Sequence, residues 1–297
     1  MGYKITCLTP IKHIKNAYEN LSKLGEVNYC PYSHYKTAIY ECKDAEVIFV
    51  NPNKMGYRLD ANLIKNSKNL KFIVTASTGT NHIDLEAAKL HNIEVISLTT
   101  HLEIIEKISS TAEHALALTL AIIRNIPKSF DAVKNGEWDY EPYVGRQLNS
   151  LNFGIIGYGR LGKMYAKYAE VLSNENNVFC YDTKDEYNCD YHKVTLESML
   201  HFCDVISLHV HLNDSSRKMV NDNFFEKVHS KPYLINTSRG DIVDEISVVK
   251  ALKSGVIAGY TTDVISDELG GNFKESPIIQ AANDGYNIIV TPHIGGM

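Results

Sequence analysis

Three stretches in the second half of the chain carry the side chains best suited to catalysis. They read INTSRGD at 235–241, TTDVISDE at 261–268 and VTPHIGG at 290–296. Each continues an apolar run typical of a buried strand. In a doubly wound parallel sheet, all three would therefore lie at the edge where such folds bind their ligands. Together they supply one arginine, several acids and one histidine.

Reduction of a 2-oxo acid by hydride transfer requires these side-chain types. A cation must hold the carboxylate and polarise the ketone, and the planar fork of Arg239 suits both tasks. His293 can deliver a proton near neutral pH, and a neighbouring carboxylate would stabilise its charged form and fix its tautomer. Taken singly, each residue has an ordinary alternative: a surface ion pair for Arg239, a turn cap for His293, and a solvated acidic run for Glu268.

The segment LNFGIIGYGRLGK, at 151–163, predicts a dinucleotide-binding turn. An apolar strand leads into the spacing G-x-G-x-x-G, and a helical pattern follows. Gly157 permits a tight turn, Gly159 lets the backbone approach a pyrophosphate, and Gly162 allows the helix to pack closely on the strand. The N-terminus of that helix offers N–H groups and a positive dipole end to the phosphates.

A second strand-like run ends at Asp182, twenty residues after Gly162. The Asp182 carboxylate can accept hydrogen bonds from both ribose hydroxyls and would repel a 2′-phosphate. Thr183 and Lys184 follow it and no arginine does, so we expect NAD rather than NADP as the cofactor. A glycine-rich turn without a ligand is the ordinary alternative. The strand, helix, second strand and terminal acid together favour the dinucleotide.

The rest of the chain alternates apolar runs with helical patterns, which predicts α/β architecture with two doubly wound parallel sheets. We expect a substrate domain over residues 1–100 and a cofactor domain over residues 101–297. STAE at 110–113 forms a capping-box pattern ahead of a long apolar helix, with Pro127 just beyond its predicted end. Apolar residues at spacings of three and four predict another helix over 12–24.

Composition argues against several classes of function. The chain has 297 residues, 44% of them hydrophobic, and a net charge of −5, so no basic excess exists for general nucleic-acid binding. We expect no signal peptide and no membrane span, because no sufficiently long apolar run is present. The six cysteines show no C-x-x-C and no metal-ligand spacing, so we expect reduced thiols in a cytoplasmic protein without a metal.

At these motifs the sequence resembles the D-isomer-specific 2-hydroxyacid dehydrogenases, the family that includes D-3-phosphoglycerate dehydrogenase. GIIGYGRLGK resembles the cofactor loop of the family, STAEHALAL its interdomain helix, INTSRGDIVDE its arginine signature and VTPHIGG its histidine signature. The resemblance covers nearly the whole chain. It implies a flavodoxin-like substrate domain, a Rossmann NAD-binding domain, and a homodimer built largely on the latter. It also implies an NAD-dependent oxidoreductase acting on a small D-2-hydroxy acid, with a 3-phosphoglycerate-like substrate as one option.

The resemblance also implies roles for individual residues. Arg239 would bind and polarise the substrate, His293 would donate the proton in reduction, and Glu268 would pair with His293. Thr78 and Gly79 would hold the substrate carboxylate through backbone N–H groups. The other implied residues contact the cofactor: Arg160 and Leu161 at the pyrophosphate, Asp263 at the nicotinamide carboxamide, and Thr237, Ser238, Gly295 and Gly296 around the nicotinamide.

Two features depart from the family pattern. Lys107 and Ile108 stand where relatives commonly have Asn-Thr, in a loop on the substrate side. The sequence stops at Met297, whereas relatives continue into a helix that completes the first domain. For a phosphorylated substrate, the basic candidates near the first-domain cleft are Lys54, Arg58 and Lys107, for which a solvated surface position is the ordinary alternative.

Two other functions suit the same fold. One is a non-enzymatic NAD-sensing module that reports nucleotide occupancy to a partner, as corepressors of this family do. The other is formate oxidation, which is weaker because the formate enzymes of the family carry glutamine where Glu268 stands. Loss of turnover in a His293 variant that still binds NADH would separate the enzyme from the sensor.

Overall fold

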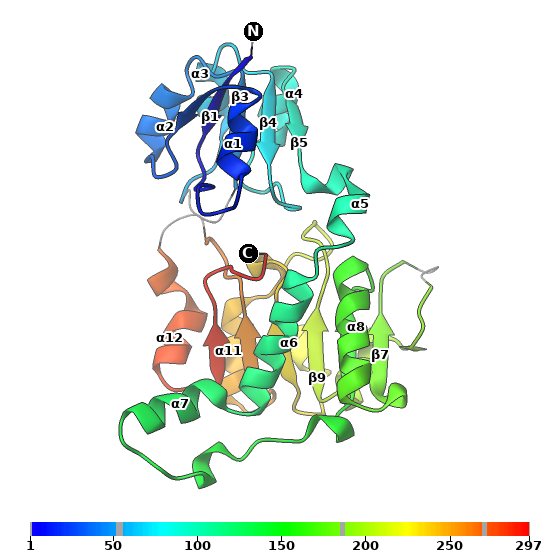
Figure 1. Ribbon diagram of the computed structural model, residues 1–297. Helices are drawn as coiled ribbons and strands as arrows, with labels where there is room; N and C mark the ends of the chain where they lie inside the picture. Colours follow the sequence, from blue (N-terminus) through cyan, green and yellow to red (C-terminus); the bar gives the residue numbers. More distant parts are fainter. Residues whose placement is uncertain (1, 52–55, 185–187, 269–271, 297) are drawn as a thin grey trace. The chain divides into compact units, whose positions relative to one another are not determined.

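The structure of the chain is a computed structural model that describes residues 2–51, 56–184, 188–268 and 272–296. Contacts divide it into two compact units, Met1–Lys107 and Ile108–Glu268 with Asn272–Met297. Each unit contains a parallel sheet with helices packed against it (Figure 1). The division into domains at residue 100 stays a prediction.

The first unit contains a five-stranded sheet in the order β2-β1-β3-β4-β5, which is the flavodoxin-like order that was predicted. Its core is formed by buried apolar residues such as Ile48, Leu63 and Ile73. The strands are β1 (Tyr3–Cys7), β2 (Gly25–Tyr29), β3 (Val47–Val50), β4 (Phe72–Thr75) and β5 (Glu94–Ile96). The helices are α1 (Ala17–Ser22), α2 (Tyr35–Glu41), α3 (Ala61–Asn66), α4 (Leu85–Leu90) and α5 (Leu102–Ile105).

The second unit contains a seven-stranded sheet in the order β12-β11-β10-β9-β6-β7-β8. Read from β8, this is the Rossmann order with one further strand, which confirms the predicted fold class. The strands are β6 (Phe153–Ile156), β7 (Val178–Tyr181), β8 (His192–Lys193), β9 (Val205–Leu208), β10 (Tyr233–Asn236), β11 (Gly259–Thr262) and β12 (Ile288–Val290). The helices are α6 (Ser110–Ile123), α7 (Ile126–Lys134), α8 (Arg160–Leu172), α9 (Leu196–Phe202), α10 (Asp222–Phe225), α11 (Glu245–Lys253) and α12 (Pro277–Asn283).

Helices cover both faces of the seven-stranded sheet (Figure 1). Successive residues of β6 point to opposite faces, so Ile155 and Ile156 belong to two different cores. The core around Ile155 includes Ile122 of α6, whereas the core around Ile156 includes Val248 of α11. Burial on both faces explains why these strands read as continuous apolar runs in the sequence.

The helix that follows the unit boundary begins and ends elsewhere than predicted. Its N-cap is Ser109 rather than Ser110, and the Ser109 hydroxyl donates to the carboxylate of Glu113 at 2.5 Å. The chain then turns at Asn125, whose φ is 51°. Pro127 lies in the first turn of α7, where a residue without an N–H costs no helix hydrogen bond. The proline therefore starts a new helix after the break.

The predicted helix over 12–24 is also wrong in extent. Helix α1 contains only six residues and follows Asn16, whose φ is 62°. Ile14 and Leu24, two of the apolar residues that suggested the helix, are 52% and 59% exposed. Their spacing therefore does not mark a buried helix face, which is the assumption on which periodicity depends.

Three chemical features bear on function. All six cysteines are free, and Cys7, Cys42, Cys180 and Cys203 are buried. Among the described residues, no helix is both long enough and apolar enough to cross a membrane. Within the same ranges, no group of three or more His, Cys, Asp or Glu side chains is arranged to hold a metal ion.

A polar network runs through the core beside the glycine turn. The hydroxyls of Thr119 and Tyr165 lie 2.8 Å apart, and the Ser207 hydroxyl lies 2.9 Å from Nε2 of His209. The rings of Tyr165 and His209 are 5.1 Å apart. A Cβ placed on Gly157 would lie 2.7 Å from the His209 carbonyl oxygen, so the turn packs directly on the backbone of His209. Burial lowers the pKa of His209 from 6.5 to about 3.

We expect His209 to make the protein less stable in mild acid. Between its folded pKa of about 3 and its unfolded value of 6.5, the unfolded chain binds the extra proton, so stability falls as pH drops through this window. One such proton contributes at most about 1.4 kcal/mol per pH unit. Urea unfolding at pH 7.5 and pH 5.5 measures the loss. H209Q should lose less stability over this interval than the wild type, and equal losses would contradict the assignment.

Candidate active site

The predicted catalytic and cofactor residues of the second unit follow the carboxyl ends of its strands. Because the strands are parallel, these segments lie at one edge of the sheet. The chain passes from β6 to β7 on one side and returns to β9 on the other, so the strand order reverses beside β6. The segments are 157–162 after β6, 182 after β7, 237–239 after β10, 263–268 after β11 and 293–296 after β12.

The glycine turn has the geometry that a dinucleotide requires. Gly157 has a φ of 93°, which side chains rarely adopt, and a Cβ on Gly162 would lie 2.0 Å from the Gly157 carbonyl oxygen. Apart from the adjacent residues, no atom of the described chain lies within 4 Å of the Cβ position of Gly159, so the backbone is open there. Helix α8 begins at Arg160, so the N–H groups of its first turn point toward this space.

The side chain of Arg160 is engaged within the protein. Its Nη1 donates to the carbonyl oxygen of Ile108, the residue that opens the second unit. This bond is consistent with a pyrophosphate contact through the backbone of Arg160 and Leu161 rather than through the guanidinium. That contact stays a prediction.

Asp182 braces the glycine turn as well as facing the predicted ribose site. One carboxylate oxygen accepts from the backbone N–H of Tyr158 at 2.8 Å, and the other accepts from that of Lys184 at 3.0 Å. Each oxygen has two lone pairs, so acceptor capacity remains for ribose hydroxyls. The negative charge at this position favours NAD over NADP.

The D182A variant should bind NADH about 10- to 100-fold more weakly, because hydrogen bonds to a charged group contribute about 1.5–3 kcal/mol. NADPH binding should fall less or improve, since the repulsion of its 2′-phosphate is removed. Titration of nicotinamide fluorescence measures both dissociation constants. D284A, at an exposed helix end, is the control. Equal losses for both cofactors would show that Asp182 acts only by bracing the turn.

Glu268 and His293 form the central pair of the site. Nδ1 of His293 lies 3.0 Å from a Glu268 carboxylate oxygen, and the two side chains are 28% and 21% exposed. The backbone on both sides of the pair is unusual, because Asp267 and His293 each have a φ of 55°. Non-glycine residues at positive φ are uncommon and gather at functional sites.

Arg239 lies within electrostatic reach of this pair. Burial lowers the pKa of its guanidinium, and the nearby Glu268 carboxylate raises it to a smaller degree. Nη1 of Arg239 donates to the carbonyl oxygen of Ser238 at 2.6 Å. The Arg239 carbonyl oxygen accepts from Nδ2 of Asn236 at 2.9 Å, which fixes the backbone of this loop. A partly desolvated guanidinium suits the binding of a small anion.

The loops that carry Arg239 and Glu268 are locked together. A Cβ on Gly240 would lie 2.0 Å from the carbonyl carbon of Ile265, so only glycine permits this approach. The Glu245 carboxylate accepts from the backbone N–H of Ser266 at 2.8 Å and from the hydroxyl of Ser276 at 2.7 Å. These contacts place the Glu268 loop, and motif matching alone did not find them because they depend on the tertiary packing.

Asp263 is almost fully buried and holds the segment that carries His293. Its carboxylate accepts from the hydroxyl of Thr291 at 2.6 Å, from the N–H of Ile294 at 2.9 Å and from the N–H of Gly295 at 2.7 Å. Nε2 of His114 lies 3.3 Å from the same carboxylate. The contact of Asp263 with a nicotinamide carboxamide stays a prediction. His114 was not among the predicted site residues, because its partner Thr291 lies 177 residues away in the chain.

The predicted nicotinamide contacts differ in what they offer a ligand. Oγ1 of Thr237 is buried and has no hydrogen-bond partner among the described residues. The Ser238 hydroxyl, by contrast, donates to the Leu208 carbonyl oxygen at 2.7 Å. A buried polar atom without a partner is costly unless a ligand satisfies it, so Thr237 fits the presence of a bound cofactor.

In the first unit, Thr78 and Gly79 lie in the turn after β4. The Ser77 hydroxyl donates to the carbonyl oxygen of Gly79 at 2.6 Å, and it lies 3.0 Å from the Thr75 hydroxyl. These bonds hold the turn in one conformation. The donation of hydrogen bonds from its backbone N–H groups to a substrate carboxylate has still to be tested. The role of Thr78 and Gly79 stays a prediction.

The basic residues considered for a substrate phosphate have different surroundings. Lys54 lies outside the described residues. Nη2 of Arg58 donates to the Ile83 carbonyl oxygen at 3.2 Å, so this side chain has a structural role. Lys107 is exposed in the turn after α5. These contacts therefore do not indicate a phosphorylated substrate.

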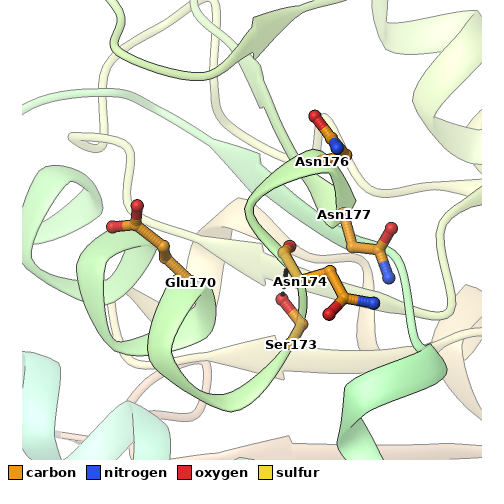
Figure 2. A pocket seen from close by; sticks show the side chains of 5 residues that line it. All are labelled: Glu170, Ser173, Asn174, Asn176 and Asn177. Carbon is orange, nitrogen blue, oxygen red and sulfur yellow. Dashed lines mark hydrogen bonds between the residues drawn. The ribbon is translucent and has the colours of Figure 1, made fainter.

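A surface depression lies at the far end of α8 from the glycine turn. Figure 2 shows the side chains that line it: Glu170, Ser173, Asn174, Asn176 and Asn177. The Ser173 hydroxyl donates to the Asn174 carbonyl oxygen at 3.2 Å, and Nδ2 of Asn174 donates to the Asn149 carbonyl oxygen. A 13-residue helix is about 20 Å long, so this depression is separate from the candidate site. Its polar groups close the end of the helix.

Comparison with known proteins shows which sequences this chain resembles. A sequence model described as D-isomer specific 2-hydroxyacid dehydrogenase, NAD binding domain, matches residues 116–295. A glycerate dehydrogenase from Methylorubrum extorquens is 34% identical over 256 residues, covering 84% of this chain and 76% of the relative. A D-3-phosphoglycerate dehydrogenase from Archaeoglobus fulgidus is 34% identical over 241 residues, covering 80% of this chain. The aligned part is 43% of that relative, so the chain spans less than half of its length.

Solved structures show the same fold. A D-lactate dehydrogenase from Aquifex aeolicus, complexed with NAD and lactic acid, has a TM-score of 0.82 and 27% identity, with 98% of this chain and 88% of that chain covered. A formate dehydrogenase from Staphylococcus aureus in complex with NAD has a TM-score of 0.82 and 24% identity, with 99% of this chain and 89% of that chain covered, and supports the fold alone.

Proposed function

Because the chain belongs to the D-isomer-specific 2-hydroxyacid dehydrogenase family, we propose that it transfers a hydride between NAD(H) and a small D-2-hydroxy acid or its 2-oxo form. One observation carries the proposal: His293 is paired with Glu268 at 3.0 Å, and Glu268 in turn interacts electrostatically with Arg239. This set can bind an anionic carbonyl compound and exchange one proton with its oxygen. The glycine turn and Asp182 supply the cofactor side.

The pairing determines which nitrogen of His293 reacts. Nδ1 faces the Glu268 carboxylate, which only accepts, so Nδ1 carries a proton. Nε2 is then the atom that exchanges a proton with the substrate. In reduction, the imidazolium donates its Nε2 proton to the oxygen that becomes the hydroxyl. The neutral ring that remains keeps the tautomer set by Glu268.

Arg239 would bind the substrate carboxylate and polarise the carbonyl through its planar fork. NAD(H), held by residues 157–162 and Asp182, supplies or accepts the hydride. Thr237 would be a hydrogen-bond partner for this group, because its buried Oγ1 has no partner among the described residues. Thr78 and Gly79 of the first unit would add backbone N–H donors to the substrate carboxylate.

A panel of 2-oxo acids tests the activity. NADH oxidation is followed at 340 nm with phosphohydroxypyruvate, hydroxypyruvate, glyoxylate, pyruvate and bulkier branched analogues, with NADPH in parallel. Turnover of one compound that disappears in H293A supports the dehydrogenase and identifies the substrate side chain. Both glycerate-type and phosphoglycerate-type relatives exist, and comparison of hydroxypyruvate with phosphohydroxypyruvate separates them. No turnover of any member would contradict the proposal.

The second candidate is an NAD-dependent binding module without catalysis. The glycine turn and Asp182 favour it equally, because binding of the cofactor at these residues does not require turnover. NADH binding without oxidation, together with a stable complex with a protein partner, would support this alternative. The Glu268–His293 bond favours the enzyme, because a sensor of nucleotide occupancy needs no oriented proton donor.

We also propose a homodimer formed through the second unit. Helix α7 and the following loop expose six large apolar side chains, which we name the α7 patch: Ile126, Phe130, Val133, Trp138, Tyr140 and Val144. Trp138 is 92% exposed, and burial of such side chains is the main source of energy in stable interfaces. Light scattering with W138E tests the patch, with V171E on exposed α8 as the control. Equal masses for wild type and W138E would contradict it.

The remaining assignments concern location and partners. The four buried thiols support a cytoplasmic, reducing environment. The net charge of −5 favours a small-molecule partner over nucleic acid or an anionic membrane surface. Fractionation of cells that express the full protein checks the location.

A further inference from the structure

His114 connects α6 to the segment that carries the proposed proton donor. Its Nε2 lies 2.8 Å from the hydroxyl of Thr291 and 3.3 Å from the carboxylate of Asp263. Thr291 directly follows β12, and His293 is two residues further on. The histidine side chain is 17% exposed, so these contacts lie largely out of solvent.

The hydrogen-bond directions around His114 follow from the available protons. The Asp263 carboxylate already accepts from the N–H groups of Ile294 and Gly295. The Thr291 hydroxyl has one proton, and the 2.6 Å contact with the carboxylate uses it. Its oxygen must therefore accept from His114, which requires a proton on Nε2.

We propose that His114 is a positioning residue that holds the His293 segment in its reactive conformation through Thr291 and Asp263. The inference rests on the proposed function. The chain of bonds runs from His114 to Thr291, from Thr291 to Asp263, and from Asp263 to the two N–H groups that follow His293. The contacts of His114 that carry this inference are with Thr291 and Asp263, neither of which is the proposed proton donor.

The backbone of His293 explains why this support is needed. Its φ of 55° is a conformation that a side chain disfavours, and such strain persists only where surrounding contacts maintain it. The bonds to Ile294 and Gly295 maintain it directly, and the space for Gly295 is tight, because a Cβ there would lie 2.9 Å from Asp263. Release of Thr291 would let Asp263 and this backbone shift together.

The position of His114 in the chain links this support to the unit boundary. Helix α6 begins at Ser110, and the second unit begins at Ile108, whose carbonyl oxygen accepts from Arg160. His114 therefore lies in the second turn of the first helix after the boundary. Arg160 connects the glycine turn to this stretch of chain, and His114 connects the stretch to the His293 segment.

Two substitutions of His114 separate its hydrogen bond from its volume. H114L fills similar space without a donor, and H114Q can place an amide N–H near the position of Nε2. We expect kcat of H114L to fall about 100-fold, the loss typical of a catalytic group displaced by about 1 Å. KM should change much less, because Arg239 is unaffected. H114Q should recover most of kcat, and H91L, at an exposed residue of the first unit, should match the wild type.

Substitutions of Thr291 test the other partner of the same hydrogen bond. T291V removes the hydroxyl and should lower kcat like H114L, whereas T291S keeps the hydroxyl and should not. In the double variant H114L/T291V, the losses should not multiply, because both remove the same connection. H114Q as impaired as H114L, or losses that multiply in the double variant, would overturn the proposal.

A measurement without turnover keeps this inference distinct from the proposed function. Histidine-selective ¹⁵N labelling and long-range ¹H–¹⁵N correlation show which ring nitrogens carry protons, and the His114 signals are those missing in H114Q. A proton on Nε2 supports the inferred bond even if no 2-oxo acid is turned over. A neutral ring protonated only on Nδ1 overturns it even in an active enzyme. An inactive wild type with the Nε2 proton present contradicts only the proposed function.

Discussion

The H293A variant is expected to reduce the best 2-oxo acid about 1,000-fold more slowly than the wild type, because it lacks the proposed proton donor. NADH should bind with nearly unchanged affinity, since the residues proposed to contact its pyrophosphate and ribose follow β6 and β7 rather than β12. Stopped-flow measurement of NADH oxidation at saturating substrate gives the rate of the chemical step. Fluorescence titration gives the dissociation constant of NADH.

H201A is the matched control, because His201 is an exposed histidine of α9 in the same unit. It should match the wild type in both measurements. E268Q should give a smaller loss than H293A, since it weakens the orientation of the ring at Nδ1 but leaves Nε2 in place. If H293A keeps most of the wild-type rate while it still binds NADH, His293 is not the proton donor.

The R239A variant is expected to lower kcat/KM about 1,000-fold, equivalent to about 4 kcal/mol, because it removes the proposed charged partner of the substrate carboxylate in a partly desolvated site. R239K keeps the charge but has no planar fork, so we expect an intermediate loss of about 30-fold. Steady-state kinetics with the best substrate of the panel measures both effects.

R217A, which removes a different arginine, is the control for R239A. Arg217 forms a 2.5 Å surface ion pair with Asp241, two residues beyond Arg239, and its side chain is 53% exposed. Loss of an exposed ion pair has little effect, so R217A should keep kcat/KM within about twofold of the wild type. If R239A behaves like R217A, then Arg239 belongs to the surface and the substrate carboxylate is held elsewhere.

Patterns of apolar residues in the sequence predicted the architecture well where those residues are buried in the structure. Continuous apolar runs identified strands such as β6 and β9, because each is covered on both faces by helices. The same reasoning failed for residues 12–24, where Ile14 and Leu24 have helical spacing but face solvent. It also misplaced the end of α6, which lies at Ile123, so that Pro127 is in the first turn of α7. Periodicity indicates a face, and only packing shows whether that face is buried.

The sequence by itself determined the fold class and the segments that meet at one sheet edge, because strand alternation and the G-x-G-x-x-G spacing are local and parallel strands must align their carboxyl ends. The tertiary structure decided which side chains pair across that edge. Hydrogen bonds depend on distance and direction, which no spacing encodes when the partners lie 25 residues apart, as Glu268 and His293 do, or 177 apart, as His114 and Thr291 do. The positive φ of His293 likewise exists only because the surrounding contacts hold it.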